Sequence, residues 1–557
     1  MDERQKKLLA IGGGLGCVAI CCFIALVVFV IVDPFGWIDR LFGGGDPLAG
    51  SMPEDTDMYI SVDMGRLLSD DAEAVIGAII ESIPEPGVDD LEATMDEVID
   101  EIFHGYGFTF SEDIQPWMGQ YLSIAATDLD SLAYGDPSES MIVALEVRDR
   151  GAADDFIQDF IEISAQIDDT HYESFEYRGV TIYEDPYGYD SEALARSGKV
   201  LLFSPSAISI QDAIDAQEGD SLADHPDFKR ITSEMPNNRF LTIYLGENLL
   251  TSFDDAIFGL GRGGLSDAYT RSMALTFAFT DFGIQFDAFL GIDEAEMDEA
   301  QRELMLSMQT QGTMISMLPE DTVGFFIGSR LDQLWEEIEN SMETTIGGDF
   351  DDSMRFFEDS FGFRPDLDLF PLLDGEWSFV IVPGIDSLFF GEDMGFGIML
   401  IVESSQEDDL RDVVEDARMA LERQGMDVIE RSADGGTIYT IEDYGIQMLS
   451  MGIQDGILMI GTDATIMQDT MEGSSSIEDD RDFLNVWDAF PRDTTPVIYL
   501  NIHSLLDIYR QDMDASWDDM IWDIGFDPRV FTHLAAGSGG IENGVIRATI
   551  IVVMEMD

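Results

Sequence analysis

The chain has 557 residues and a formal net charge of -84, from 112 acidic residues against 28 lysines and arginines. A surface this negative repels phosphate backbones, so nucleic acid is excluded as an expected partner. Hydrophobic residues make up 45%, which is typical of folded domains and too high for a disordered chain. A simpler interpretation of the acidity, solubility in a salty exterior, remains open.

At the N-terminus, residues 8–32 form a run of 25 residues without a charge, preceded by three basic residues. This length and flanking charge predict an uncleaved transmembrane helix. Residues 1–7 are then expected in the cytoplasm, and the rest of the chain outside it, extracellular or periplasmic. A cleavable signal peptide or a lipoprotein signal is disfavoured, because neither a small-residue cleavage site nor a lipobox accompanies the run. Residues 33–51 are expected to be a flexible tether.

All three cysteines, Cys17, Cys21 and Cys22, lie in this apolar run. The remaining residues therefore form no disulfide and carry no thiol chemistry. A large extracellular domain from a eukaryote would usually contain disulfides, so their absence weakly favours a bacterial or archaeal source.

An internal repeat is the most informative feature of the sequence. The string Pro-Glu-Asp-Thr occurs at 53–56 and again at 319–322, each time before an apolar strand pattern. Further matches follow in order, and from Tyr106 to Tyr244 their separation stays between 255 and 257 residues. We interpret this as a duplication. It predicts a first repeat at 52–292, a helical linker at 293–317 and a second repeat at 318–557.

Within the repeats, short β-branched and aromatic runs predict strands, and longer runs with apolar residues every three or four positions predict helices. Helices are expected at 152–167 and 406–424, and a hairpin turn at Asn543-Gly544. The expected fold class is α+β: an N-terminal transmembrane helix followed by two tandem duplicated α+β units with mainly antiparallel sheets. The strands predicted in the first repeat are 58–62, 121–126, 141–147, 180–183, 199–204, 240–245, 273–279 and 284–290.

The features that together resemble one family are the repeated Pro-x-Asp-Thr opening, the Gly-Phe turn at Gly107-Phe108 and Gly362-Phe363, which Pro-x-x-Gly follows at 116–119 in the first copy, and the N-terminal apolar run. It is the prokaryotic, membrane-anchored group catalogued as domain of unknown function 3352. The resemblance covers roughly residues 52–557. It implies a membrane-attached envelope protein, and it brings no catalytic residue to this chain.

No constellation typical of catalysis or metal binding stands out. The histidines, His104, His171, His225, His503 and His533, are too far apart in sequence for a zinc motif. The run 536–540, Ala-Gly-Ser-Gly-Gly, lacks the first glycine of a nucleophile elbow and is expected in a turn. We therefore predict no catalytic, cofactor-binding or metal-binding residues.

Acidic clusters are numerous, but none has the spacing of an EF-hand loop. They could associate loosely with Ca²⁺, and we expect no defined cation site and no cofactor. The clusters considered are Asp128-Leu-Asp130, Asp349-Phe-Asp351-Asp352, Asp366-Leu-Asp368 and Glu478-Asp479-Asp480.

Three functional hypotheses follow. The first is a non-enzymatic binding or interaction module in the cell envelope, which takes a protein or an apolar ligand between its two halves. The second is a hydrolase that uses carboxylates, which a pocket lined by two or three of them in only one half would favour. The third is a structural surface protein adapted to high salt.

Overall fold

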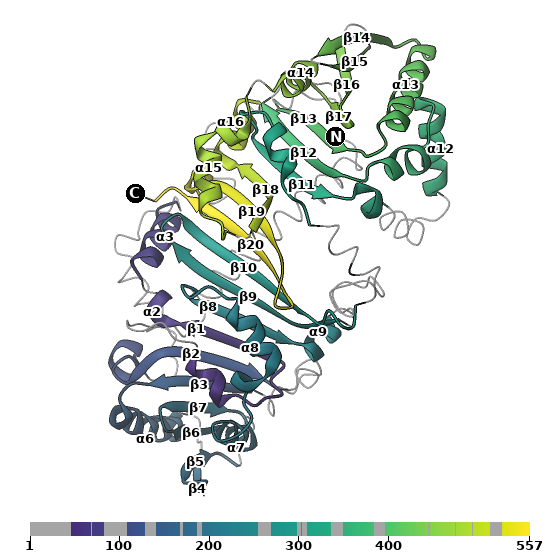
Figure 1. The fold of residues 1–557 in the computed structure, drawn as a ribbon. Helices are drawn as coiled ribbons and strands as arrows, with labels where there is room; N and C mark the ends of the chain where they lie inside the picture. Colours follow the sequence, from purple (N-terminus) through teal and green to yellow (C-terminus); the bar gives the residue numbers. More distant parts are fainter. Residues whose placement is uncertain are drawn as a thin grey trace. The chain divides into compact units, whose positions relative to one another are not determined.

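The computed structural model describes residues 46–556 with breaks (Figure 1). The chain forms two compact units. The breaks are at 68, 83–107, 128–140, 168–170, 187–191, 254–268, 298–301, 303–308, 336–348, 384–395, 434, 444–445, 474, 493 and 513–525.

The first unit is built on antiparallel strands paired in the order β4–β5–β6–β7–β3–β2–β1–β8–β9. Most of β9 belongs to this unit. The strands are β1 (Met58–Asp63), β2 (Met118–Ala126), β3 (Met141–Val147), β4 (Glu173–Tyr177), β5 (Val180–Glu184), β6 (Ala193–Ser197), β7 (Val200–Ser204), β8 (Leu241–Gly246) and β9 (Thr270–Thr280).

The second unit follows the order β14–β15–β16–β17–β13–β12–β11–β18–β19–β20–β10, again antiparallel at every pairing. Its strands are β10 (Gly283–Ile292), β11 (Gly324–Ser329), β12 (Glu376–Pro383), β13 (Phe396–Glu403), β14 (Asp427–Ala433), β15 (Gly436–Asp443), β16 (Ile446–Gln454), β17 (Ile457–Gly461), β18 (Thr494–Asn501), β19 (Phe531–Glu542) and β20 (Val545–Met554).

The strands of the first unit recur in the same order in the second, where β11 to β19 take the places of β1 to β9. The second unit then continues with β20 and β10. The register agrees as well. In the first unit Tyr59 lies opposite Tyr244, and in the second Phe325 lies opposite Tyr499. Positions in one unit can therefore be matched to positions in the other. A residue that occurs in only one unit is then not required by the shared strand order.

Helices are fewer and mostly short. The two longest, α6 (Arg150–Ile167) and α13 (Glu407–Arg423), occupy matched places after β3 and β13. The others are α2 (Met64–Leu67), α3 (Asp70–Glu81), α7 (Ala207–Ala216), α8 (Pro226–Ser233), α9 (Glu247–Phe253), α12 (Asp349–Phe361), α14 (Ala464–Glu472), α15 (Arg481–Asp488) and α16 (Ile502–Asp512).

Short 3-10 helices precede the matched strands β1 and β11. They are η1 (Pro47–Ser51) before β1 and η6 (Thr313–Met317) before β11. Leu48 of η1 and Met314 of η6 are both buried. Residues 46–51, the last part of the expected tether, are thus packed against the first unit. The described part of the expected linker 293–317 contains η6 and only isolated α-helical structure.

The fold-class prediction is wrong as stated. Twenty antiparallel strands dominate the described residues, and the helices between them are mostly one to three turns long, so the balance of an α+β protein is not found. Among the residues that the structure describes, no helix is long and apolar enough to cross a membrane. The helix expected at 8–32 lies outside the described residues.

The hairpin expected at Asn543-Gly544 is confirmed. Glu542 of β19 lies opposite Val545 of β20, and the two turn residues have φ of 51° and 72°. Positive φ at both central residues is the geometry that twists two antiparallel strands correctly, and Asn-Gly adopts it at low cost.

Candidate ligand-binding site

A cavity of about 900 Å³ lies within the first unit. Strands β1, β2 and β8 contribute residues to one wall, and helix α8 contributes Lys229, Thr232 and Ser233. Aromatic and apolar side chains, among them Phe228 and Phe240, line it together with charged groups. The cavity is large enough for a small organic molecule.

The strand register explains the polar part of the wall. Alternate residues of a strand point to the same face, so Tyr59, Ser61 and Asp63 of β1 share one. Ser61 lies opposite Thr242 of β8, and Asp63 lies opposite Tyr121 of β2. These five residues all line the cavity. Hydroxyl and carboxylate groups from three neighbouring strands therefore lie together on one face of the sheet.

Tyr59 anchors this row. Its ring is fully buried and packs edge-to-face on Phe228, with the ring centroids 5.9 Å apart. Its hydroxyl donates a hydrogen bond to Asp46 Oδ2, and Asp46 Oδ1 accepts from the backbone N–H of Leu48 at 3.0 Å. Burial raises the pKa of Asp46, and burial together with the nearby Asp46 carboxylate raises the pKa of Tyr59. The phenol is therefore a neutral donor near pH 7.

Arg239 enters the cavity just before β8. Its Nε donates to Thr242 Oγ1 at 2.9 Å, and its Nη1 donates to the carbonyl oxygen of Pro236 at 2.7 Å. Burial lowers the pKa of Arg239, although the charge of Asp46 opposes the shift. The guanidinium is held through two of its three nitrogens and is partly removed from water.

Asp63 is occupied by structural hydrogen bonds. Its Oδ1 accepts from the backbone N–H of Arg66 at 3.1 Å and from Gln120 Nε2 at 2.9 Å. Burial, followed by the negative charge of Asp63, raises the pKa of Tyr121. The carboxylate thus fixes the start of α2 and the side chain of Gln120.

The second unit carries different residues at the matched positions. Phe325 stands in the place of Tyr59, so the buried hydroxyl is missing. The separation of 255 residues that relates Pro236 to Pro491 and Tyr244 to Tyr499 places Thr494 where the first unit has Arg239. The second unit therefore forms the same strand order without the phenol and without the guanidinium.

Glu376 of the second unit is matched to Tyr121, since it lies opposite Ser329 as Tyr121 lies opposite Asp63. It is 8% exposed and serves its own fold. Its carboxylate accepts hydrogen bonds from the chain that leads into η6. The donors include Thr310 Oγ1 at 2.7 Å, the Gly312 N–H at 3.0 Å, the Thr313 N–H at 2.8 Å and the Met314 N–H at 3.3 Å, with the Gln311 N–H and Thr313 Oγ1.

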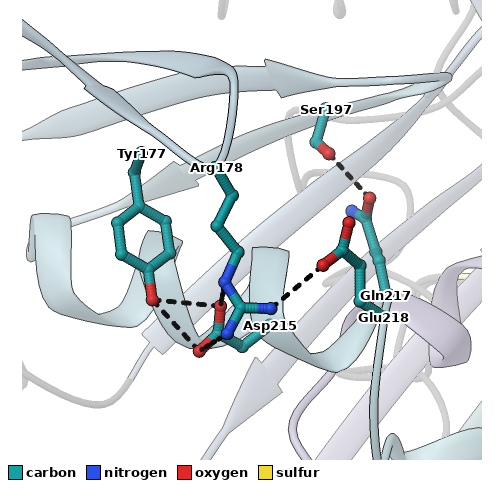
Figure 2. Close-up of polar contacts among 6 residues, drawn as sticks. All are labelled: Tyr177, Arg178, Ser197, Asp215, Gln217 and Glu218. Carbon is teal, nitrogen blue, oxygen red and sulfur yellow. Dashed lines mark hydrogen bonds and ion pairs between the residues drawn. The ribbon is translucent and has the colours of Figure 1, made fainter.

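A second, more open pocket of about 800 Å³ also belongs to the first unit. Arg178, in the turn between β4 and β5, pairs with Asp215 of α7 at 2.9 Å and with Glu218 at 3.0 Å (Figure 2). Tyr177 donates to the same Asp215 at 3.1 Å. The side chains of Arg178, Asp215 and Glu218 are 40–66% exposed, so the two ion pairs contribute little to stability. Burial, then the charges of Asp55 and Asp215, raises the pKa of Asp212 in this pocket.

The acidic clusters considered in the sequence have structural roles where they are described. Asp366 and Asp368 receive hydrogen bonds from Arg364, and Asp480 caps α15. Asp128-Leu-Asp130 lies outside the described residues, and the side chains of 349–352 are not described. Within the described ranges, no group of three or more His, Cys, Asp or Glu is arranged to hold a metal ion.

His104 also lies outside the described residues. His503 Nε2 is 2.6 Å from the Arg529 carbonyl oxygen, and burial lowers the pKa of His533. The run 536–540 was expected in a turn because of its glycines, and this prediction is wrong. The run lies inside β19, where it pairs with β18 and β20 around a register shift.

Sequence reasoning missed the cavity. Asp46 fell in the expected tether, and Arg239 had no motif around it. One signal was available: Arg239 is matched to Thr494 and Tyr59 to Phe325 within an otherwise similar repeat. Such exchanges of a polar residue for an apolar or small one mark positions where two copies differ in task.

The family described as "Protein of unknown function (DUF3352)" matches residues 89–516, and the chain belongs to this family. No match was found among curated proteins.

Three solved structures with some likeness are crystal forms of TP0453. Form I has a TM-score of 0.23 at 13% identity and covers 47% of this chain and 84% of its own. Forms III and IV have TM-scores of 0.24 and 0.23 at 11% identity, and cover 49% and 48% of this chain and 91% and 89% of their own. Likeness at this level carries no argument about function.

Proposed function

We propose that this protein is a non-enzymatic binding module whose first unit holds a small molecule in the cavity beside Tyr59 and Arg239. One observation carries the proposal: the polar groups of this cavity are replaced in the second unit, which reaches the same strand order without them. Groups that the fold itself does not require are candidates for function.

The energetics support this assignment. Burying the Tyr59 hydroxyl and partly burying the Arg239 guanidinium costs free energy that hydrogen bonds only partly offset. At the matched positions the second unit uses Phe325 and Thr494, which avoid that cost. A binding role would explain why the first unit retains the costly groups, since stability is commonly reduced at functional sites.

The alternative is a hydrolase that uses carboxylates. The same cavity favours it to some degree, because Asp46, Asp63, Asp70 and Asp71 line it and all belong to one unit. We place it second because the carboxylates have other tasks. Both oxygens of Asp46 and one of Asp63 accept structural hydrogen bonds, and Asp70 and Asp71 lie in the first turn of α3.

A site outside the cytoplasm is also a proposal. It is supported by the charge of -84 and by the absence of cysteine from residues 23–557. Protease added to cells from which any outer membrane and wall have been removed, but whose cytoplasmic membrane is intact, should digest the protein. Protection until that membrane is lysed would contradict this location.

The proposed function is tested by thermal unfolding of the full chain with four fragments: benzoate, phenyl phosphate, benzyl alcohol and benzylamine. At least one should raise the midpoint by binding the folded state. Ser233→Trp places a large ring at the cavity wall and should abolish the shift. Asp488→Trp is the matched control, because Asp488 ends α15 as Ser233 ends α8.

The control should keep the shift. No shift with any fragment at millimolar concentration, or equal loss in both variants, would argue against a binding cavity in the first unit.

A further inference from the structure

Arg239 has donors that the protein does not use. A guanidinium carries five N–H donors, and the two hydrogen bonds of Arg239 use Nε and Nη1. Within the described part of the chain, Nη2 has no hydrogen-bond partner. The hydrogen bonds to Thr242 and Pro236 therefore fix the orientation of the guanidinium. The N–H groups of Nη2 remain able to donate to a ligand.

The nearby carboxylates do not neutralise this cation by direct contact. Among the described residues, Arg239 forms no ion pair within 4 Å, whereas Arg178, Arg196 and Arg230 each contact a carboxylate. Asp46 is engaged by Tyr59 and Leu48, as shown above. A guanidinium that is partly desolvated without a contacting anion is unfavourable.

The scarcity of basic residues in the chain strengthens the case that Arg239 has a specific role. Only 28 of 557 residues are Lys or Arg, yet Arg66, Lys229 and Arg239 all line this one cavity. Lys229 is paired with Asp224 at 2.8 Å, and both side chains are 58% exposed. Arg239 is half-buried, whereas Arg66 and Lys229 are exposed, and the position matched to Arg239 in the second unit is Thr494.

We propose that Arg239 binds the oxyanion of a small ligand, a carboxylate or a phosphate group, whose apolar body lies against Phe228, Met235 and Phe240. This inference rests on the proposed function of the cavity and specifies its ligand class. Guanidinium groups bind both oxyanions through paired hydrogen bonds, which fix the orientation of the ligand. The three apolar side chains line the same cavity.

The four fragments distinguish the ligand classes, because they share one ring and differ in the attached group. Benzoate or phenyl phosphate should raise the unfolding midpoint at millimolar concentration, while benzyl alcohol and benzylamine should have little effect. The two anions separate the two sources of the oxyanion. If only the alcohol or the amine binds, the cavity still binds ligands and the assignment of an anion is wrong. If none binds, both proposals fail.

Arg239→Met should weaken binding of the preferred anion by at least about tenfold, since a charged hydrogen-bonded contact is lost. Arg150→Met is the matched control and should change the affinity less than about threefold, because Arg150 is exposed at the start of α6 and does not line the cavity. Equal losses in both variants would contradict the special role of Arg239.

Two further readouts exclude a purely structural role. Without ligand, Arg239→Met should unfold at the wild-type temperature or above it, because an uncompensated charge is removed. Arg239→Lys should recover part of the anion affinity, since it keeps the charge and loses the planar fork. A lowered midpoint for Arg239→Met, with no recovery in Arg239→Lys, would overturn the inference.

Discussion

Asp46 and Glu376 meet the same local need in different ways. Each supplies a carboxylate to the N-terminal end of the 3-10 helix that precedes the first strand of its unit, where backbone N–H groups lack partners. In the first unit the carboxylate is the N-cap residue itself. In the second, the N-cap is Gly312 and the carboxylate comes from β12. Tyr121, at the position matched to Glu376, is therefore left to line the cavity.

Glu376→Gln tests this role. Burial alone would raise the pKa of Glu376, but hydrogen bonds from Thr313, Thr310 and backbone N–H groups lower it below its ordinary value. The change should reduce the free energy of unfolding of the second unit by about 2–3 kcal/mol at pH 7, as for hydrogen bonds to a buried charge. Denaturant titration measures it, with exposed Glu403→Gln as the control.

The comparison of wild type with Glu376→Gln should also depend on pH. A folded-state pKa below the unfolded value of 4.5 means that the stabilisation is present above pH 4.5 and is lost as pH falls through the folded pKa. The difference between wild type and Glu376→Gln should therefore shrink below pH 4.5. A difference that stays constant to lower pH would show that the charge is not responsible.

At the scale of elements, β10 and β20 are joined by a buried polar cluster. Asp287 of β10 has a side chain that is 1% exposed, and its Oδ1 accepts from Arg547 Nη2 at 2.8 Å and from Thr549 Oγ1 at 2.6 Å. Gln285 Nε2 donates to Oδ2 at 2.9 Å. The carboxylate is thus compensated on both oxygens, chiefly by the neighbouring strand.

Arg547→Met should reduce the free energy of unfolding by about 3–5 kcal/mol, because it leaves the buried Asp287 charge without its cation. The double variant Asp287→Asn with Arg547→Met should be more stable than the single one, since the unpaired charge is gone. Equilibrium unfolding of both variants gives the comparison. Equal stability of the two would show that the ion pair is not what couples these strands.

The sequence predicted elements well where their apolar pattern was strong. All eight strands expected in the first repeat occur within a few residues of their expected ends. The two strands that the sequence analysis did not predict are β4 and β6, and both lack a strong apolar pattern. β4 is mostly exposed and reads Glu-Ser-Phe-Glu-Tyr, and β6 is short and rich in small residues, so neither shows an apolar alternation.

The cavity was beyond prediction for a physical reason. Its wall joins residues from β1, β2, β8 and α8, which are brought together only by strand pairing across about 180 positions of sequence. The alternation of β1 separates Tyr59, Ser61 and Asp63 from its apolar face, but alternation within one strand does not predict which other strands and helix will lie beside that face. Only the comparison of the two repeats held a hint.

At the scale of the whole molecule, the charge of -84 dominates. Like charges repel one another in the compact state, and added salt screens that repulsion. The unfolding midpoint of the full chain should therefore rise with NaCl between low salt and about 1 M, where the screening length is about 3 Å. Scanning calorimetry across this range measures the effect, and a midpoint indifferent to NaCl would remove self-repulsion as a factor in stability.

The central claim is that one unit binds a small molecule and the other does not. Native mass spectrometry of the full chain purified from its own cells tests it most directly, with a solvent extract of the same sample and with Ser233→Trp and Asp488→Trp in parallel. We predict a bound small molecule in wild type and in Asp488→Trp, and none in Ser233→Trp. An unliganded mass for all three proteins, or a bound molecule that Ser233→Trp retains, would contradict the account.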